Sequence, residues 1–384
     1  MRLLHTSDWH LGRNLHGYSL IDAQRDAVET LVREAISRHV DVVIVAGDVF
    51  DRAVPPIEAL RILNDAVARL NEASIVTVLI AGNHDSGERL STYSSVLRDG
   101  VWVIGDAVGL GTPIVLKDQF GEVLVYALPF LDPDLVRHAL GEDEPLERSH
   151  DAVMTRALEI IAADRQARGN PRCITIGHAF VVAGEAPEIS ESERDLSIGG
   201  VQAVLSARFG DAFDYVALGH LHRPQQVGSS RIRYSGSLLR YSFSEAGHEK
   251  SFLVIDIGEP GAELEVEQIV IEQPRPMSRL RGTMDELLSQ AHAQSREHFV
   301  ELVVTEESYP ERMHARLDAV FPFALRKEFE STRQADPSAP RGDARGRDPL
   351  EVVRDFLDST GVSFDDDTDR ELIRSVYERV RDSR

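Results

Sequence analysis

The sequence is poor in cysteine and has no long apolar runs. Its 384 residues include one cysteine, Cys173, so an internal disulfide is excluded. Cys173 lies within an apolar run, which favours a small buried hydrophobic role. No run approaches the roughly 18 apolar residues of a membrane span, and the first residues form a strand pattern without signal-peptide architecture. We therefore expect a protein of the reducing cytoplasm with no membrane segment.

Basic residues are scarce as well. Lysine and arginine number 42 against 64 aspartates and glutamates, which gives a formal net charge of -22. So acidic a chain argues against broad nonspecific binding of nucleic acid. A nuclease is still compatible with it, because two divalent ions would add about four positive charges and a partner subunit would complete a DNA groove. The chain also lacks the Walker A pattern, which excludes a P-loop ATPase.

One short apolar run stands out among the segments that are present. Residues 42–46 are β-branched or small, and the run ends in Gly47 and Asp48. Such a run between polar flanks is typical of a strand buried on both faces. Ligands of open α/β folds lie beyond the carboxyl ends of strands, where Asp48 is placed, and Gly47 allows a tight turn. Taken alone, Asp48 is more simply interpreted as a turn residue.

The same pattern recurs at four other places, so that five predicted strands end in residues that bind metals. The other blocks are Asp8-Trp9-His10, Gly82-Asn83-His84-Asp85, Gly177-His178 and Gly219-His220-Leu221-His222. The mixture of carboxylate, imidazole and amide suits Mn²⁺, with Fe²⁺, Zn²⁺ or Mg²⁺ as alternatives. The lack of cysteine ligands argues against a closed structural zinc site. Two metals suit phosphoryl hydrolysis, and Asp48 is the best candidate for a bridging carboxylate.

The first part of the chain alternates strands with helices. Amphipathic patterns predict helices at residues 23–37 and 56–70, between the first strands. This order implies right-handed crossovers and a mainly parallel sheet. Later strand patterns have no regular helices between them and suggest a second, more antiparallel sheet. They are residues 123–128, 232–234, 251–257 and 265–271.

Composition divides the chain into four segments. Residues 1–272 carry all the ligand blocks, and residues 276–332 alternate helical and strand patterns like a small α+β unit. Residues 333–347 are rich in Pro, Gly and Ser, as in a linker. Residues 348–384 predict two short amphipathic helices, which are marginal alone. We interpret the pair as a docking element for a partner, with packing against the α+β unit as the alternative.

The five blocks together resemble the signature of the calcineurin-like metallophosphoesterases. Further segments resemble the SbcD-type nuclease subunits of bacterial SbcCD complexes: residues 5–12, 47–51, 193–194, 197–200, 234–237 and 242–245. That resemblance implies an α/β fold, a β-sandwich of two mixed sheets flanked by helices. It also implies a small α+β capping domain and C-terminal helices. Leu238 departs from the proline that is frequent there.

The resemblance also implies roles for the ligand blocks. One metal would be held by Asp8, His10, Asp48 and His222, and the second by Asp48, Asn83, His178 and His220. His84 would bind no metal and would protonate the leaving oxygen or stabilise the transition state, oriented by either Asp85 or Asp51. Five residues near the blocks are candidates for DNA phosphate contacts, although an ordinary solvated loop explains the first three equally well: Arg13, Asn14, His16, Arg89 and Arg223.

The preferred function is a two-metal DNA nuclease subunit that serves DNA repair, recombination and replication. By resemblance it would act as an ATP-dependent double-strand exonuclease and a single-strand or hairpin endonuclease. An SbcC-type coiled-coil ATPase would dock on the C-terminal helices, and the chain would form a homodimer within a heterotetramer. The alternative is a metallophosphoesterase for small nucleotides or phosphoproteins, which the linker and helix pair disfavour. The intact ligand set disfavours a third option, a non-catalytic scaffold.

Overall fold

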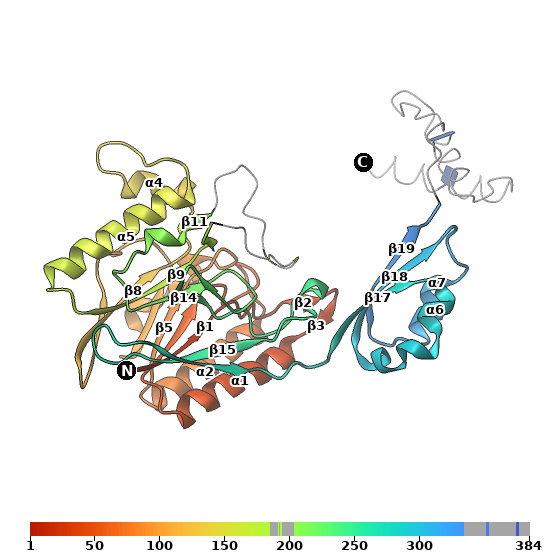
Figure 1. Cartoon of the computed structure of the whole chain (residues 1–384), viewed down its shortest axis with the longest axis horizontal. Helices are drawn as coiled ribbons and strands as arrows, with labels where there is room; N and C mark the ends of the chain where they lie inside the picture. Colours follow the sequence, from red (N-terminus) through yellow and green to blue (C-terminus); the bar gives the residue numbers. More distant parts are fainter. Residues whose placement is uncertain (185–190, 192, 194–202, 334–350, 353–373, 376–384) are drawn as a thin grey trace. The chain divides into compact units, whose positions relative to one another are not determined.

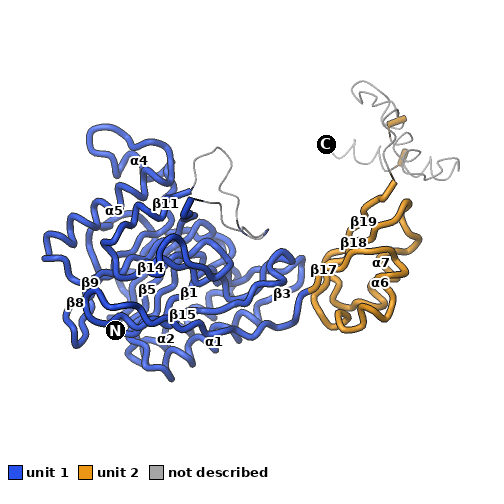
Figure 2. The backbone as a smooth tube through the Cα atoms, viewed as in Figure 1, with its two compact units in different colours: residues 1–277 blue, residues 278–384 orange. Residues whose placement is uncertain are grey.

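The computed structural model describes residues 1–184, 191, 193, 203–333, 351–352 and 374–375. The chain divides into two compact units, residues 1–277 and 278–384 (Figure 2). The linker and helix pair predicted at 333–347 and 348–384 lie almost entirely outside the described residues. In the part of the chain that is described, no helix has the length and apolarity needed to cross a membrane.

The first sheet of unit 1 has six strands in the order β16-β15-β1-β4-β5-β6 (Figure 1). Neighbours pair in parallel from β1 to β6, and β15 and β16 add antiparallel pairs. The strands are β1 (Arg2–Thr6), β4 (Val42–Ala46), β5 (Val76–Ile80), β6 (Val101–Ile104), β15 (Ser251–Asp256) and β16 (Glu265–Val270). The predicted crossover helices are confirmed as α1 (Ile21–Ser37) and α2 (Ile57–Glu72), which run along one side of this sheet.

The second sheet has six strands in the order β13-β14-β12-β9-β8-β7, and it is also mixed. Its strands are β7 (Ile114–Asp118), β8 (Gly121–Leu128), β9 (Arg172–His178), β12 (Tyr215–Gly219), β13 (Gln225–Val227) and β14 (Ser229–Tyr234). Helix α5 (His150–Ala167) packs on its outer face, and α4 (Pro133–Leu140) contacts α5. The predicted sandwich of two mixed sheets flanked by helices is therefore confirmed.

The distribution of strands between the sheets differs from the sequence prediction. The segments at 251–257 and 265–271 were expected in a second, more antiparallel sheet, but β15 and β16 extend the first sheet beside β1. The second sheet is parallel through β8, β9, β12 and β14. A strand pattern reports which faces are buried, whereas the pairing partner depends on contacts far along the chain, so local sequence does not specify it.

The core lies between the two sheets. The two-residue alternation of side chains along each strand explains which residues enter it. In β8, Val123 and Val125 face the first sheet, and Leu124 and Tyr126 face α5. Alternate side chains of a strand point to opposite faces, so a strand covered on both sides is apolar throughout. Burial of both faces fixes the register of the strands that carry the ligand blocks at their ends.

Short elements complete unit 1. They are β2 (Asn14–Leu15), β3 (Tyr18–Ser19), α3 (Gly87–Ser91), η1 (Ser94–Val96), β10 (Val181–Val182), β11 (Val204–Leu205), η2 (Ser206–Arg208) and η3 (Phe243–Glu245). Unit 2 has a three-stranded sheet, β17-β18-β19, with a core of its own. Its elements are β17 (Met277–Gly282), α6 (Met284–Leu288), η4 (Gln290–Glu297), β18 (Phe299–Glu306), α7 (Met313–Asp318) and β19 (Ala324–Ser331).

A buried arginine at the start of β9 ties the second sheet to the chain that follows β15 of the first. The Arg172 guanidinium binds the Asp118 carboxylate of β7 and donates to the Gly258 carbonyl, which follows β15, at 2.8 Å. The Arg172 side chain is 1% exposed. The hydrogen bond from Arg172 holds the pKa of Asp118 well below its usual range.

Asp118→Asn is expected to destabilise unit 1 by about 3 kcal/mol at neutral pH, because it leaves the Arg172 charge buried without its partner. A depressed carboxylate pKa stabilises the fold above the ordinary pKa of about 4, and this contribution is lost as the pH falls below it. Urea denaturation of both proteins from pH 7 to pH 3 measures the difference. A gap between wild type and variant that does not shrink below about pH 4 contradicts this account.

Candidate metal centre

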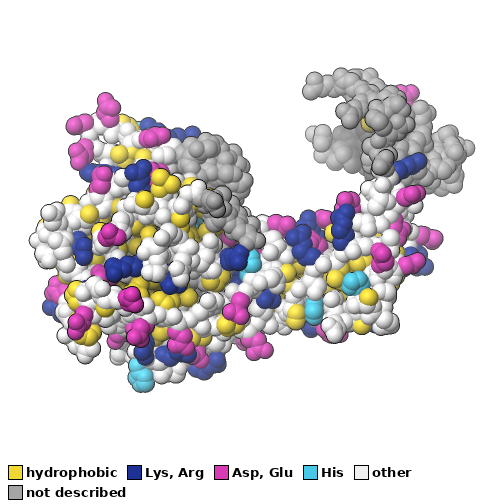
Figure 3. Space-filling model, viewed as in Figure 1, with side chains coloured by type: hydrophobic (Ala, Val, Ile, Leu, Met, Phe, Trp, Pro, Cys, Tyr) yellow, Lys and Arg dark blue, Asp and Glu magenta, His cyan; other side chains and the backbone are white. Residues whose placement is uncertain are grey.

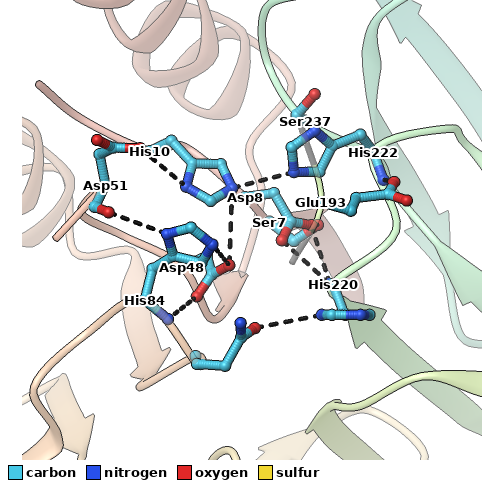
Figure 4. A network of polar contacts seen from close by, with 12 residues as sticks. Ser7, Asp8, His10, Asp48, Asp51, His84, Glu193, His220, His222 and Ser237 are labelled. Atoms are coloured by element: carbon cyan, nitrogen blue, oxygen red, sulfur yellow. Dashed lines mark hydrogen bonds and ion pairs between the residues drawn. The ribbon is translucent and has the colours of Figure 1, made fainter. Parts of the chain in front are cut away.

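The five ligand blocks meet at one end of the sandwich. They follow β1, β4, β5, β9 and β12, whose carboxyl ends lie at the same edge of the two sheets. Three groups of side chains bring ligand atoms within 4.8 Å of one another: Asp8 with His10 and His222, Asp8 with Asp48 and His178, and His10 with Asp48 and His84. Figure 4 shows His10, His222, Asp48 and His84 turned toward a common centre. The structure thus forms a buried Asp/His cluster that is consistent with a dinuclear metal site.

The backbone turns sharply where the strands end. Asp8, His10 and Asp48 have φ values of 51°, 43° and 50°, and His220 has a φ of 115°. Non-glycine residues rarely adopt positive φ, although Asp, Asn and His do so more readily than most. Strained conformations of this kind cluster at functional sites, where the surrounding structure holds them. Here they stop the strand and turn consecutive side chains toward the centre.

Asp48 occupies the middle of the cluster. Its Oδ2 lies 3.6 Å from His10 Nε2 on one side and 3.6 Å from His178 Nε2 on the other. Its Oδ1 accepts a hydrogen bond from the backbone N–H of His84 at 2.8 Å, which fixes the carboxylate plane. A carboxylate shared in this way by two groups of imidazoles has the geometry of a bridge between two ions.

Glycine is required beside Asp48. A Cβ on Gly82 would lie 2.2 Å from Asp48 Oδ1 and 2.3 Å from its backbone nitrogen. Gly47, with a φ of 86°, would place a Cβ 2.3 Å from Nδ1 of His178. Both distances are well inside van der Waals contact, so a side chain at either position must displace a candidate ligand.

We predict that Gly82→Ala weakens the binding of divalent ions at least about tenfold, because it moves the Asp48 carboxylate. The matched control is Gly247→Ala, since a Cβ at Gly247 meets nothing within 4 Å. Isothermal titration with Mn²⁺ compares the two variants with the wild-type protein. Equal affinity in all three proteins would show that the close approach of Gly82 is unimportant.

One half of the centre is built around Asp8. Its carboxylate accepts hydrogen bonds from Ser7 Oγ at 2.5 Å and from the backbone N–H of His220 at 3.0 Å. The loop after β1 is thereby tied to the loop after β12. Nε2 of His10 lies 3.0 Å from Nε2 of His222. Ligand atoms of one ion lie about 3 Å apart when the metal–ligand bonds are about 2.1 Å, so this spacing fits a shared ion.

The other half is built around Asn83. His178 Nδ1 donates to the Ala46 carbonyl at 2.9 Å, so the neutral ring carries its lone pair on Nε2. That nitrogen lies 2.9 Å from Asn83 Oδ1, and His220 Nδ1 lies 3.2 Å from the same oxygen. An acceptor nitrogen and an acceptor oxygen at this distance repel each other, and a cation between them removes this repulsion. The donor set therefore fits a second divalent ion.

Burial sets the charges of these groups. It lowers the pKa of His178 and of His222 to about 4, and burial with neighbouring histidines lowers the pKa of His10 and His220 far below the usual range. Burial, reinforced by the Asp48 charge, raises the pKa of Asp8 well above its usual value. The imidazoles are neutral, so they give the neighbouring carboxylates little positive charge. A bound divalent cation would supply that charge and stabilise the ionised carboxylates.

His84 lies beside both halves. Its Nδ1 donates to the backbone carbonyl of Asp51 at 2.9 Å, and its Nε2 is 4.0 Å from Asp48 Oδ2. The Asp85 carboxylate instead accepts from the backbone N–H groups of Val49, Phe50 and Gly82. Burial and the Asp48 charge raise the pKa of Asp85 to about 7. Asp51 thus contacts His84 through its main chain, and the Asp85 carboxylate joins the loops after β4 and β5.

The candidates for DNA contact occupy different environments. Arg13 is packed, with its guanidinium 3.4 Å from the Asp51 carboxylate and 5.5 Å from the centre of the Tyr241 ring. The His16 ring stacks on Phe243. Asn14, Arg89 and Arg223 are exposed. The structure therefore does not bring all five into one group with the ligand blocks.

Several buried residues that support the ligands were not predicted from the sequence. Gln24 on α1 donates to the His10 carbonyl at 2.8 Å, and the Tyr241 hydroxyl binds the Trp9 carbonyl. Ser235 Oγ lies 2.9 Å from Ser7 Oγ. Glu245 lies 3.2 Å from His222 Nδ1, with Lys250 behind it. Ser235 and Glu245 fall within segments that carry the family resemblance, whereas no sequence pattern marked Gln24 or Lys250.

The chain is similar to known proteins over most of its length. Two solved structures with low identity are similar to parts of the chain: protein TT1561 of Thermus thermophilus (16% identity, 70% of this chain and 98% of that chain, TM-score 0.39) and a dimetal phosphatase from Danio rerio (13%, 71% and 97%, TM-score 0.42). Residues 273–360 match the SbcD C-terminal family, described as the type 5 capsule protein repressor C-terminal domain. Residues 1–224 match the calcineurin-like phosphoesterase family. The chain therefore belongs to the calcineurin-like phosphoesterases, as a member of the SbcD type.

Proposed function

We propose that this chain is the two-metal DNA nuclease subunit of an SbcCD-type complex that processes DNA ends. The observation that carries the proposal is the Asp48 carboxylate, whose Oδ2 lies 3.6 Å from imidazole nitrogens on both sides. The match of residues 273–360 to the SbcD C-terminal family supports DNA as the substrate, since it joins a phosphoesterase unit to that domain. We further propose a cytoplasmic location and Mn²⁺ as the preferred ion, because mixed carboxylate, imidazole and amide donors suit it.

The proposed chemistry is phosphodiester hydrolysis. Two divalent ions, when bound, would supply positive charge to the phosphate and lower the pKa of an attacking water molecule. Asp8, His10, Asp48 and His222 would hold one ion, and Asp48, Asn83, His178 and His220 would hold the other. His84, as an imidazolium whose Nδ1–H is donated to the Asp51 carbonyl, would give its Nε2 proton to the leaving oxygen and become the neutral ring. The hydrogen bond that His84 donates to the Asp51 carbonyl fixes the His84 ring, and the Asp85 carboxylate holds the loops after β4 and β5 together.

The acidity of the chain limits how DNA is held. Figure 3 shows acidic and basic side chains interspersed over the face it presents, as expected for a formal net charge of -22. We propose that the ions and a partner supply most of the positive charge, with Arg89 and Arg223 as exposed phosphate contacts. Arg13, Asn14 and His16 contribute from the loop after β1. Association with DNA should therefore be weak when neither the ions nor a partner is bound.

The proposed partners are an SbcC-type coiled-coil ATPase and a second copy of this chain. The predicted helix pair at 348–384, which lies outside the described residues, would bind the ATPase through its apolar stripes. An exposed apolar strip at the start of α2 supports a homodimer. Val54, in the loop before α2, is 61% exposed, and Ile57 and Leu60, one helical turn apart in α2, are 57% and 42% exposed, which makes an apolar surface strip.

Deleting residues 348–384 is expected to separate chemistry from assembly. All candidate metal ligands lie in unit 1, so the truncated chain should keep Mn²⁺-dependent cleavage of bis-p-nitrophenyl phosphate within about twofold of the full chain, as sites without shared contacts act independently. It should lose co-purification with the ATPase and ATP-stimulated cutting of duplex DNA. Undiminished assembly would place the ATPase contact elsewhere on the chain.

A substrate panel tests the proposed function itself. Labelled duplex ends, a DNA hairpin, a mononucleotide and a phosphopeptide are offered to the full chain with Mn²⁺, with and without the ATPase partner. We expect cleavage of duplex ends to require the partner and ATP, and the hairpin to be cut internally. Preferential hydrolysis of the mononucleotide or the phosphopeptide would overturn the proposed function in favour of a small-substrate phosphoesterase.

A further inference from the structure

A buried ion pair lies behind His222, on the side of the ring away from His10. Glu245, at the end of η3, contacts Lys250 at 2.6 Å between Oε2 and Nζ, and both side chains have 0% exposure. Lys250 directly precedes β15 of the first sheet, whereas His222 follows β12 of the second. The pair therefore spans the joint between the sheets at the metal centre.

The ion pair holds His222 at two points. Glu245 Oε1 lies 3.2 Å from His222 Nδ1, and Lys250 Nζ donates to the His222 carbonyl at 2.7 Å. Lys250 also donates to Ser237 Oγ at 2.9 Å, so its three N–H groups are all used. The ring and the main chain of one candidate ligand are thus fixed by a single pair of charges.

The pair is costly to bury, so its position needs a reason. Apolar residues of similar size are often as stable as a buried ion pair, or more stable. A carboxylate that accepts the Nδ1–H of a ligand histidine fixes the tautomer with the lone pair on Nε2, and it makes that nitrogen a stronger donor to a metal. Lys250 keeps the Glu245 carboxylate ionised and oriented for this task. None of these contacts reaches Asn83 or His178.

We propose that Glu245 and Lys250 are positioning residues that set the affinity of one ion, the one held with His222, and leave the other ion unaffected. This inference rests on the proposed two-metal function and deepens it. It predicts two ions of separately adjustable affinity. The ion that depends on His222 is supported by a charged pair, and the ion that depends on His178 is supported by the Ala46 carbonyl.

The test uses the full chain and Mn²⁺ as the probe. Glu245→Gln alone leaves the Lys250 ammonium buried without its counter-charge, so the decisive protein is the double variant Glu245→Gln/Lys250→Met, which removes both charges. Titration calorimetry gives the affinity of each ion, and electron paramagnetic resonance separates a coupled Mn²⁺ pair from a single ion. Thermal melting of the metal-free proteins reports the fold. Asp118→Asn is the matched control, because it breaks a buried ion pair at the opposite end of β9.

The double variant is expected to bind one ion about 10- to 100-fold more weakly and the other with unchanged affinity. Its spectrum should change from a coupled pair to a single ion at intermediate Mn²⁺ concentrations. The control should melt earlier yet keep both affinities. Equal weakening of both ions, or no weakening of either, overturns this inference while the two-metal function stands. A wild-type protein that binds fewer than two ions overturns both.

Discussion

His84→Ala is expected to lower the rate of DNA cleavage by about 10²- to 10⁴-fold, the usual contribution of a positioned acid or base. The variant should still bind two ions per chain. His84 is anchored through Nδ1 to the Asp51 carbonyl, and its Nε2 stands 4.0 Å from Asp48 Oδ2, in a group with His10 and Asp48. The proposed assignment gives His84 to neither ion, so its removal should take away a proton donor and leave both ligand sets intact.

The measurement pairs a cleavage assay with metal analysis of the same preparation. His138→Ala is the matched control, since His138 is exposed in the last turn of α4 and belongs to no ligand group. The control should retain both ions and full turnover. If His84→Ala loses an ion, His84 is a ligand, and if it retains full turnover, the leaving oxygen takes its proton elsewhere.

Asp48→Asn is expected to weaken both ions by at least about 100-fold, since even residues that only support a ligand cost about 10- to 100-fold. The amide keeps an oxygen for the His84 N–H but removes the charge that two ions would share. Asp8→Asn should mainly weaken one ion, because the proposed assignment gives Asp8 to the ion held with His10 and His222 and not to the ion held with Asn83 and His178, although Asp8 lies close to His178 as well.

The metal-free proteins provide a check on the same substitution. The Asp48 charge contributes to raising the pKa of both Asp8 and Asp85, so these buried carboxylates repel one another when no cation is present. Asp48→Asn should therefore raise the melting temperature of the metal-free protein while it abolishes the stabilisation by Mn²⁺. Two ions bound with unchanged affinity by Asp48→Asn would show that Asp48 is not the bridge.

The ligand blocks could be recognised from sequence because each is local. An apolar strand followed by Gly and by Asp, His or Asn fixes where those side chains emerge, and parallel strands bring their carboxyl ends to one edge. The structure places Asp48 between His10 and His178, and its role as the bridging carboxylate stays a prediction. The sandwich of mixed sheets was predicted through family resemblance and is confirmed by the strand order.

Other features depend on contacts that no local pattern encodes. Pairing of β15 with β1 joins residues about 250 positions apart, so the sequence placed that strand in the wrong sheet. The contact between His84 and Asp51 uses a backbone carbonyl, whereas a motif names only side chains. Gln24 lies in α1, and Lys250 directly precedes β15. Their roles arise from tertiary packing, which sequence spacing alone does not reveal.

Under the proposed function, this centre cleaves DNA only when two divalent ions are bound. The direct test titrates Mn²⁺ into metal-free full chain and records, at each point, the ions bound per chain and the initial rate of cleavage of a labelled DNA hairpin. Cleavage is expected to stay near background until the first ion is bound and to rise only as the second binds. Full cleavage with a single ion bound, or no cleavage with both bound, would contradict it.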